Sequence, residues 1–283
     1  MIWVVSALAA LLALYLVFDN FTVGVNRVRI PSERVKKGLR IVMVSDLHAR
    51  SYFQNVGKMI ARERPDLILL AGDMVEDRHH TQTKRVSYAF FRDVTKIAPV
   101  YAIFGNHERR VSWQEEVRRE MEEAGIVILE NRMITMPVKE EHVTILGLDE
   151  GSGLHARFHT KAPQTDHLAL LRGCERSSGI RIVMDHYPEN FAKAGDLSYN
   201  QCAFEVMVAG HAHGGQVRLP WIGGLYAPGQ GVFPRYTKGL YREKDANLVV
   251  SNGLGGQWYL PRFGNRPSVW IIELAPEKEG EKI

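Results

Sequence analysis

The chain has 283 residues, 45% hydrophobic and 24% charged, which excludes an intrinsically disordered protein and allows one sizeable domain or two small ones. The net charge is +4. The segment 19–40, with six basic and two acidic residues, accounts for all of it, because the remaining 30 basic and 30 acidic residues cancel. A nucleic-acid-binding protein usually spreads its positive charge over a binding face, so we expect no nucleic-acid partner.

The first predicted element is an apolar run from Ile2 to Phe18, in which Ser6 and Tyr15 are the polar members. These 17 residues are at the short end of the length that spans a bilayer as a helix. A buried core helix and a cleaved signal peptide are the alternatives. However, no basic region precedes the run and no clear small-residue cleavage site follows it. We therefore predict a single-pass transmembrane anchor over residues 1–20.

A basic stretch follows the anchor, and residues 21–37 are predicted to form a juxtamembrane linker. No Lys or Arg precedes the apolar run, whereas six follow it by residue 40. By the positive-inside rule, the domain after the anchor faces the cytoplasm. The same charges are expected to hold residues 27–40 against anionic lipid headgroups.

Residues 38–275 are predicted to form one domain. In its first half, buried strands at 41–45, 67–71, 100–104 and 126–129 alternate with helices at 54–64, 82–97 and 112–124. This alternation implies βαβ units and parallel strands. The second half is predicted to contain strands at 134–138, 142–148, 180–184, 204–209, 247–251 and 268–274, with a helix at 166–174. A charged tail, 276–283, ends the chain.

Five of these strands end in side chains that can bind a metal ion or a phosphate. They are Asp46 and His48, Asp73, Asn106 and His107, His186, and His211 and His213. Ligand sites in open α/β sheets form outside the carboxyl ends of the strands, so these groups should converge. Carboxylate, amide and imidazole donors without a thiolate suit Mn, Fe or Zn. Seven ligands exceed the need of one ion, so we expect two divalent ions that share one carboxylate.

The order of these motifs resembles that of the calcineurin-like metallophosphoesterases, over roughly residues 40–275. The motifs are Asp-x-His, Gly-Asp, Gly-Asn-His-Glu, a lone His and Gly-His-x-His. The segments Gly210–Gln216 and Pro261–Pro267 are similar to the membrane-associated bacterial branch named after YkuE and YaeI. That branch is related to hydrolases of UDP-2,3-diacylglucosamine. The resemblance implies an α/β fold, a four-layer αββα sandwich of mixed sheets, to which this chain adds an amino-terminal transmembrane helix.

The resemblance also implies a role for each motif residue. Asp46, His48 and His213 would hold the first metal ion, and Asn106, His186 and His211 the second, with Asp73 as the bridging and catalytic carboxylate. His107 would be the catalytic group that contacts the phosphate, either protonating the leaving oxygen or stabilising developing charge. Manganese is the first choice for both ions, with iron or zinc as alternatives.

Further residues bear on the substrate. Arg50, Arg262 and Arg266 are candidate phosphate contacts. Eight of the large apolar residues in loops 220–233 and 255–266 would line a groove for acyl chains, dip into the bilayer or cap the core. They are Trp221, Ile222, Leu225, Tyr226, Trp258, Tyr259, Leu260 and Phe263.

The preferred function is a dinuclear phosphohydrolase that uses metal-bound hydroxide to cleave a membrane lipid-linked phosphate or pyrophosphate, similar to UDP-2,3-diacylglucosamine. One alternative is a phosphoesterase for soluble monoesters, diesters or phosphoproteins. The other is a non-catalytic metal-binding scaffold. The sequence does not indicate an oligomeric state.

Overall fold

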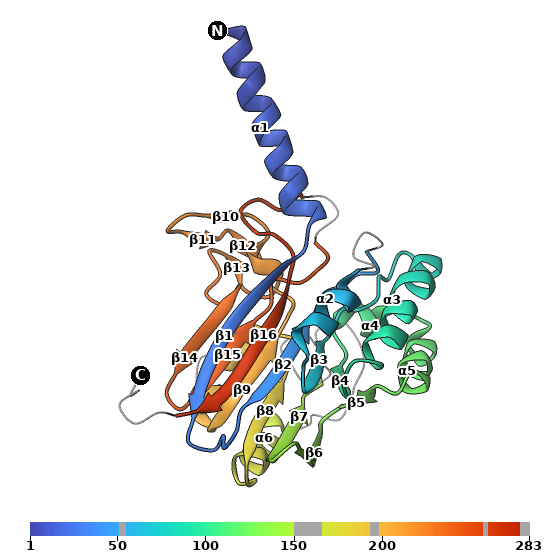
Figure 1. Ribbon diagram of the computed structural model, residues 1–283, viewed down its shortest axis with the longest axis vertical. Helices are drawn as coiled ribbons and strands as arrows, with labels where there is room; N and C mark the ends of the chain where they lie inside the picture. The colour runs from blue at the N-terminus through green and yellow to red at the C-terminus, as the bar shows by residue number, and fades with distance from the viewer. Residues whose placement is uncertain (51–54, 150–165, 193–197, 257–259, 278–283) are drawn as a thin grey trace.

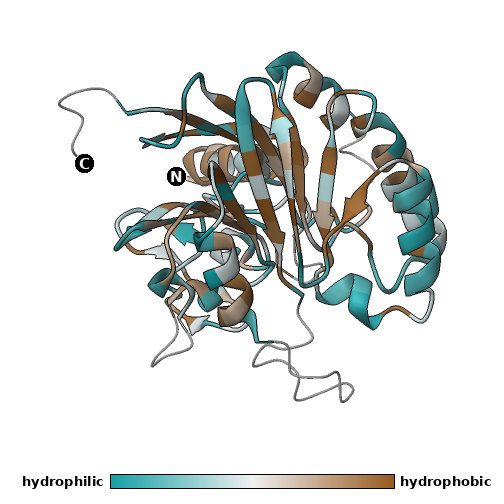
Figure 2. Cartoon of the chain, turned by 90° about the horizontal axis from the view of Figure 1, so that it is seen from below, coloured by the Kyte–Doolittle hydropathy of each residue, from teal (hydrophilic) through white to brown (hydrophobic). Residues whose placement is uncertain are grey.

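Two six-stranded mixed sheets pack face to face, and helices cover the outer face of each sheet (Figure 1). The computed structural model describes residues 1–50, 55–149, 166–192, 198–256 and 260–277. Coloured by hydropathy, the strands are largely hydrophobic, whereas the helices turn many hydrophilic residues outward (Figure 2). This is the arrangement expected of a polypeptide that buries both faces of its central strands.

The first sheet is built from strands that are distant in sequence. In spatial order they are β1 (Gly24–Ser32), β16 (Ser268–Pro276), β2 (Leu39–Val44), β3 (Leu67–Ala71), β4 (Val100–Ile103) and β5 (Val127–Ile128). Strands β2 to β5 are parallel, and β16 is antiparallel to β2 but parallel to β1. Its outer helices are α2 (Val56–Glu63), α3 (His80–Val94) and α5 (Gln114–Glu123). A short helix that the sequence reasoning did not predict, α4 (Asn106–Arg110), follows β4.

The second sheet has a parallel centre and antiparallel edges. In spatial order its strands are β14 (Gly239–Glu243), β15 (Ala246–Val250), β9 (Phe204–Ala209), β8 (Ile180–Met184), β7 (Glu141–Gly147) and β6 (Arg132–Val138). Outside it lie α6 (His167–Glu175) and the 3₁₀ turns η3 (Pro188–Ala192) and η4 (Tyr199–Gln201). Asp166 caps α6, because its carboxylate accepts a hydrogen bond from the Ala169 N–H at 3.0 Å.

Three apolar clusters hold the four layers together. The central cluster lies between the sheets, where Ile41 and Leu69 of the first sheet share one core with Ile145 and Val208 of the second, all fully buried. The other two clusters lie between each sheet and its helices. The αββα sandwich implied by the resemblance is therefore confirmed.

Helix α1 (Ile2–Phe21) projects away from one end of the domain (Figure 1). Within the described part of the chain it is the one helix long and apolar enough to cross a membrane. Its mean hydropathy is 2.2, and 6% of its most apolar window is buried. The rest of the domain therefore leaves this helix uncovered.

The segment 21–37, predicted to be a linker, contains β1, which pairs with β16 along its whole length. Most of the segment therefore belongs to the sheet. Nine extended residues span about 30 Å, so β1 carries Lys36 and Lys37 to the end of the sheet opposite α1. The expectation that residues 27–40 lie together at the headgroups beside the anchor does not hold for these two lysines. The last residues of the predicted tail, 278–283, lie outside the described residues.

The strand pairing decides which end of the domain carries the polar strand ends. Trp270 of β16 pairs both with Asn26, near the start of β1, and with Met43, near the end of β2. The carboxyl ends of β2, β3 and β4 therefore lie at the end of the domain from which α1 emerges. Two small hairpins also lie there: β10 (Arg218–Leu219) with β11 (Gly223–Gly224), and β12 (Tyr226–Ala227) with β13 (Gly231–Val232) (Figure 1).

Candidate metal centre

Five of the predicted ligands occupy a backbone conformation that is uncommon for residues other than glycine. Asp46, His48, Asp73, His211 and His213 have φ between 47° and 62°, in the left-handed region. Such a residue costs about 1–3 kcal/mol and persists only where its surroundings impose it. Here, backbone hydrogen bonds between the turns impose this conformation. The Asp46 N–H donates to the carbonyl of residue 72 at 2.9 Å, and the His48 N–H to that of Asp73 at 3.2 Å.

The glycines beside these ligands serve two different purposes. Gly72 has a φ of 87°, a left-handed value that glycine adopts without steric cost. Gly105 does not have a positive φ; a Cβ there would lie 2.7 Å from the Asp73 nitrogen. A Cβ at Gly210 would lie 2.7 Å from the Asp46 carboxylate. The last two glycines are needed because neighbouring ligands leave no room for a side chain.

The first group of candidate ligands joins β2 to the turn after β9. Asp46, His48 and His213 are buried, and one ligand atom from each lies within 4.8 Å of the other two. Both ring nitrogens of His48 and Nδ1 of His213 are buried without a hydrogen-bond partner. Buried polar atoms are normally paired, so these imidazoles fit a cation that is held between them and the carboxylate.

The second group consists of Asp73, His186 and His211, which also lie within 4.8 Å of one another. His186 Nδ1 is 2.7 Å from the Ala71 carbonyl oxygen, so this nitrogen carries the proton and leaves Nε2 as the electron-pair donor. Asp73 Oδ2 lies 3.3 Å from His186 Nε2 and 3.9 Å from His48 Nε2. Asp73 therefore lies between the two groups.

Asn106 begins α4, and its buried Oδ1 has no hydrogen-bond partner. It lines the same cavity as Asp73 and His211. A carboxamide oxygen in this position adds a neutral oxygen donor to the second group, as expected for a mixed oxygen and nitrogen metal site.

The pKa values of His48 and Asp73 shift in the direction that metal binding requires, whereas the Asp73 carboxylate overcomes the effect of burial and raises the pKa of His186. Burial lowers the pKa of His48 well below its usual value, and the nearby His107 lowers it further. Burial acts to raise the pKa of Asp73, but the imidazoles of His186 and His107 hold it well below its usual value. A neutral imidazole and an ionised carboxylate are the forms that bind metal ions.

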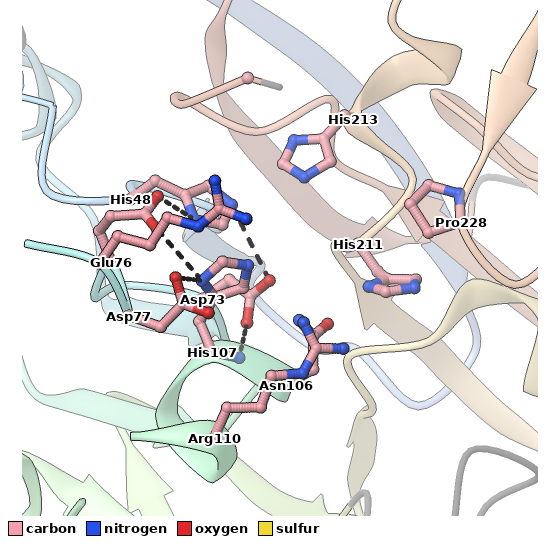
Figure 3. A pocket seen from close by; sticks show the side chains of 12 residues that line it. His48, Asp73, Glu76, Asp77, Asn106, His107, Arg110, His211, His213 and Pro228 are labelled. Atoms are coloured by element: carbon pink, nitrogen blue, oxygen red, sulfur yellow. Dashed lines mark hydrogen bonds and ion pairs between the residues drawn. The ribbon is translucent and has the colours of Figure 1, made fainter. Parts of the chain in front are cut away.

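A cavity of about 230 Å³ opens over both groups (Figure 3). Besides the ligands it is lined by His107, Glu76, Asp77, Arg78 and Arg110, and by Pro228 and Gly256. His107 Nδ1 lies 3.8 Å from a Glu76 carboxylate oxygen and 3.7 Å from one of Asp77. Burial and the Asp77 carboxyl group raise the pKa of Glu76 to about 7. Most of the lining residues have polar side chains, and two of these are guanidinium groups, which suits a phosphate.

Glu108 holds the turns that carry two of the candidate ligands. It is 1% exposed, and its carboxylate accepts four backbone N–H bonds of 2.6–3.0 Å, from Asp73, Met74, Val75 and Gly105. Burial and the Asp73 charge raise the pKa of Glu108, while the backbone N–H groups oppose this rise. Four donors on two oxygens match the acceptor capacity of an ionised carboxylate.

Asn265 links the anchor helix to the first group. Its side-chain amide donates to the carbonyls of His213, at 2.7 Å, and of Gln216, at 3.1 Å. Its backbone N–H donates to the Asp19 carboxylate of α1 at 3.1 Å. The end of α1 therefore contacts the loop that fixes the backbone of a candidate ligand.

The three predicted substrate arginines do not appear among the described residues that line the cavity. Arg262 is 2% exposed, and its guanidinium donates to backbone carbonyls of residues 252, 253, 255 and 265, so it stabilises the loop. Arg266 donates to the carbonyl of residue 23 and lies 4.7 Å above the Phe18 ring. Arg50 donates to the carbonyl of Gly256 at 3.1 Å, at the cavity edge.

The sequence reasoning missed Glu76, Arg78 and Arg110 in the cavity lining. Arg110 follows Asn106 by four residues, a spacing that places both on one face of a helix. Recognition of α4 in the sequence could therefore have identified Arg110. Of the predicted apolar loop residues, Trp258 and Tyr259 lie outside the described residues.

Comparison with known proteins finds similarity over most of the chain. The model of the family described as calcineurin-like phosphoesterase matches residues 39–215. The chain is 28% identical to the phosphodiesterase YaeI of Escherichia coli K12 and 27% identical to the metallophosphoesterase YkoQ of Bacillus subtilis 168. The YaeI match covers 83% of this chain and 82% of that protein, and the YkoQ match 84% of both. It is 22% identical to the UDP-2,3-diacylglucosamine pyrophosphatase LpxG of Chlamydia trachomatis, over 85% of this chain and 84% of LpxG.

Proposed function

Because this chain belongs to the calcineurin-like phosphoesterases, we propose that it hydrolyses a lipid-linked phosphodiester or pyrophosphate at a membrane surface. The observation that carries this proposal is the position of the polar cavity at the end of the domain from which the apolar helix α1 emerges. Two relatives support this proposal. YaeI is a phosphodiesterase, and LpxG is a pyrophosphatase for a diacylated sugar nucleotide.

The donor set fits two divalent ions. Asp46, His48 and His213 would hold one ion, and Asn106, His186 and His211 the other, with Asp73 between them. Mixed oxygen and nitrogen donors suit manganese first, and iron or zinc also fit. When bound, such a pair polarises phosphoryl oxygens and makes a coordinated water acidic enough to act as a nucleophile near neutral pH.

The remaining cavity residues orient and protonate the substrate. Arg78 and Arg110 neutralise the negative charge of the phosphoryl group. His107, whose Nδ1 lies near the carboxylates of Glu76 and Asp77, is placed to donate a proton to the leaving oxygen. After the product leaves, the imidazole takes up a proton from solvent, which restores the site for the next turnover.

We further propose that α1 is a single transmembrane span and that the domain lies in the cytoplasm. Six basic residues between Arg27 and Arg40 follow the helix, as the positive-inside rule expects of a cytoplasmic flank. A carboxyl-terminal alkaline phosphatase fusion should therefore be inactive, and a fluorescent-protein fusion bright. An active phosphatase fusion would overturn the orientation.

The test is a substrate screen with the full chain, purified in detergent and supplied with manganese. Lipid-linked nucleoside diphosphates, phospholipids, soluble nucleotides and a generic aryl phosphodiester are compared by kcat/KM. We expect preference for a lipid-linked substrate, loss of activity with a chelator, and at least a hundredfold loss in His107→Ala and Asp73→Ala. The exposed histidine variant His142→Ala serves as the control.

Two results would replace this proposal. A preference for soluble phosphoesters would favour the soluble alternative. Metal binding without cleavage of any class would favour the scaffold.

A further inference from the structure

Exposed apolar side chains gather on the two hairpins beside α1. Beyond α1, eight large hydrophobic residues are exposed in the described part of the chain, and six of them lie between residues 221 and 260. We call these six the apolar rim: Trp221, Ile222, Tyr226, Val232, Phe233 and Leu260. Their exposed fractions run from 40% to 102%, with Trp221 fully exposed. Clustering of this kind marks a contact surface rather than ordinary surface scatter.

The backbone conformation of two rim residues also indicates a contact surface. Trp221 has a φ of 64° and Phe233 a φ of 53°, in the left-handed region that bulky residues rarely adopt. Glycine or asparagine would relieve this strain. Neither aromatic side chain is buried within the chain, so packing of these rings against the domain does not account for their conformation.

The rim is continuous with α1. The Tyr15 ring of α1 lies 5.2 Å from the Phe263 ring, and the Asn20 side chain donates to the Arg262 carbonyl at 3.0 Å. Phe263 in turn accepts a backbone bond from Arg218 of β10 at 2.8 Å. Hairpin β10–β11 and the end of α1 therefore form one connected unit at one end of the domain (Figure 1).

The chemistry of this surface fits a lipid bilayer. Helix α1 is uncovered and apolar around its circumference, which a single protein partner on one side would leave largely exposed. Between His211 and Tyr241 the chain contains no Asp or Glu, whereas Arg218, Arg235 and Lys238 are present. A segment rich in aromatic and basic residues and free of acidic ones has the composition of a membrane interface.

We propose that the apolar rim inserts into the headgroup region of the leaflet from which α1 emerges, and thereby turns the catalytic cavity toward the lipid surface. This deepens the proposed function, on which its catalytic consequence rests. The base of the rim reaches the site directly, because the Leu225 N–H donates to the carbonyls of Gly215 and Val217, two and four residues after His213. Pro228, between β12 and β13, lines the cavity. The substrate headgroup enters the polar cavity while its acyl chains stay in the bilayer.

The first experiment does not depend on activity. Trp221→Cys is labelled with an environment-sensitive NBD probe in the full chain, reconstituted into vesicles of phosphatidylcholine with 30% phosphatidylglycerol, a proportion of about one anionic lipid in three. Cys174 and Cys202 are buried, so the unsubstituted chain reports background labelling. The matched control is Val127→Cys, an exposed apolar position on β5.

We expect doxyl-labelled lipids to quench the probe at 221 at least threefold more than the probe at 127. Iodide, which stays in water, should quench the probe at 221 less than the probe at 127. Equal quenching at both positions would overturn the proposal. A blue-shifted probe at 221 that lipid quenchers do not reach would also overturn it, since a second copy of the chain would then cover the rim.

The second experiment measures the catalytic consequence. Trp221→Asp combined with Phe233→Asp should lower cleavage of a vesicle-borne lipid substrate about tenfold and leave cleavage of a soluble aryl phosphodiester unchanged. An unchanged ratio between the two substrates would refute the catalytic role of the rim. If the probe is quenched but no lipid substrate is cleaved by the unsubstituted chain, the rim stands and the proposed function fails.

Discussion

Replacement of Glu108 by glutamine tests the network that holds the turns of the metal site. The carboxylate accepts two N–H bonds on each oxygen: from Met74 and Val75 on one, and from Asp73 and Gly105 on the other. Glutamine offers one acceptor oxygen, so in either orientation its amide group faces two N–H donors. Two bonds to a charged acceptor, about 1.5–3 kcal/mol each, are lost.

The net loss of stability should be smaller than the sum of these bonds. A neutral amide costs less to bury than a carboxylate, which offsets part of the loss. We therefore expect the free energy of unfolding to fall by about 2–4 kcal/mol, which a stable domain survives. The measurement is urea denaturation of the full chain in detergent micelles, followed by circular dichroism.

A matched control separates this effect from the loss of a charge. Glu115 lies on α5 with a side chain that is 82% exposed, so Glu115→Gln should change stability by less than about 0.5 kcal/mol. If Glu108→Gln also changes stability by less than about 1 kcal/mol, the four backbone bonds do not stabilise the turns as argued here.

Three further substitutions test the site. Gly105→Ala should abolish metal-dependent activity, because a Cβ at this position would displace Asp73. Gly173→Ala is the control: α6 leaves open space there, so this substitution should raise the free energy of unfolding by roughly 0.5–1 kcal/mol in urea denaturation. Asn265→Ala should weaken manganese binding about tenfold, measured by calorimetry, because the His213 backbone loses its support; an unchanged affinity would contradict this. Arg110→Ala should raise KM for an anionic substrate about tenfold through loss of a charged contact, while Arg119→Ala on the exposed face of α5 should not.

Much of the fold follows from short-range patterns in the sequence. The strand predicted at 67–71 is β3, and the strands predicted at 180–184 and 204–209 are β8 and β9. Strand β3 is an uninterrupted apolar run, and β8 and β9 are apolar except for one charged residue each, Arg181 and Glu205. All three are bounded by turn residues, as expected of strands that are buried on both faces. The predicted Asp-x-His, Gly-Asp and Gly-His-x-His motifs lie at the ends of such runs, which is why candidate ligands could be chosen from the sequence.

Other elements carry no comparable local signal. Strand β1 alternates polar and basic residues with apolar ones at the edge of a sheet, so the sequence predicted a linker. Its pairing partner, β16, lies more than 200 residues later, and no local pattern specifies a partner at that distance. The surroundings of Arg262 carry no local signal either, because the carbonyl groups that its guanidinium contacts come from a loop geometry that composition does not reveal.

The sequence by itself determined the donor types at the strand ends, and through them the class of chemistry, because carboxylate, amide and imidazole side chains have fixed preferences for metal ions. Tertiary structure alone decided where that chemistry lies. Strand β16 joins β1 to β2 and so brings the carboxyl ends of the parallel strands to the end of the domain beside α1. The lysines expected at the headgroups lie at the opposite end, since an extended strand separates them from the anchor. The direction of the strands, rather than the position of charges along the chain, sets the side on which the cavity opens.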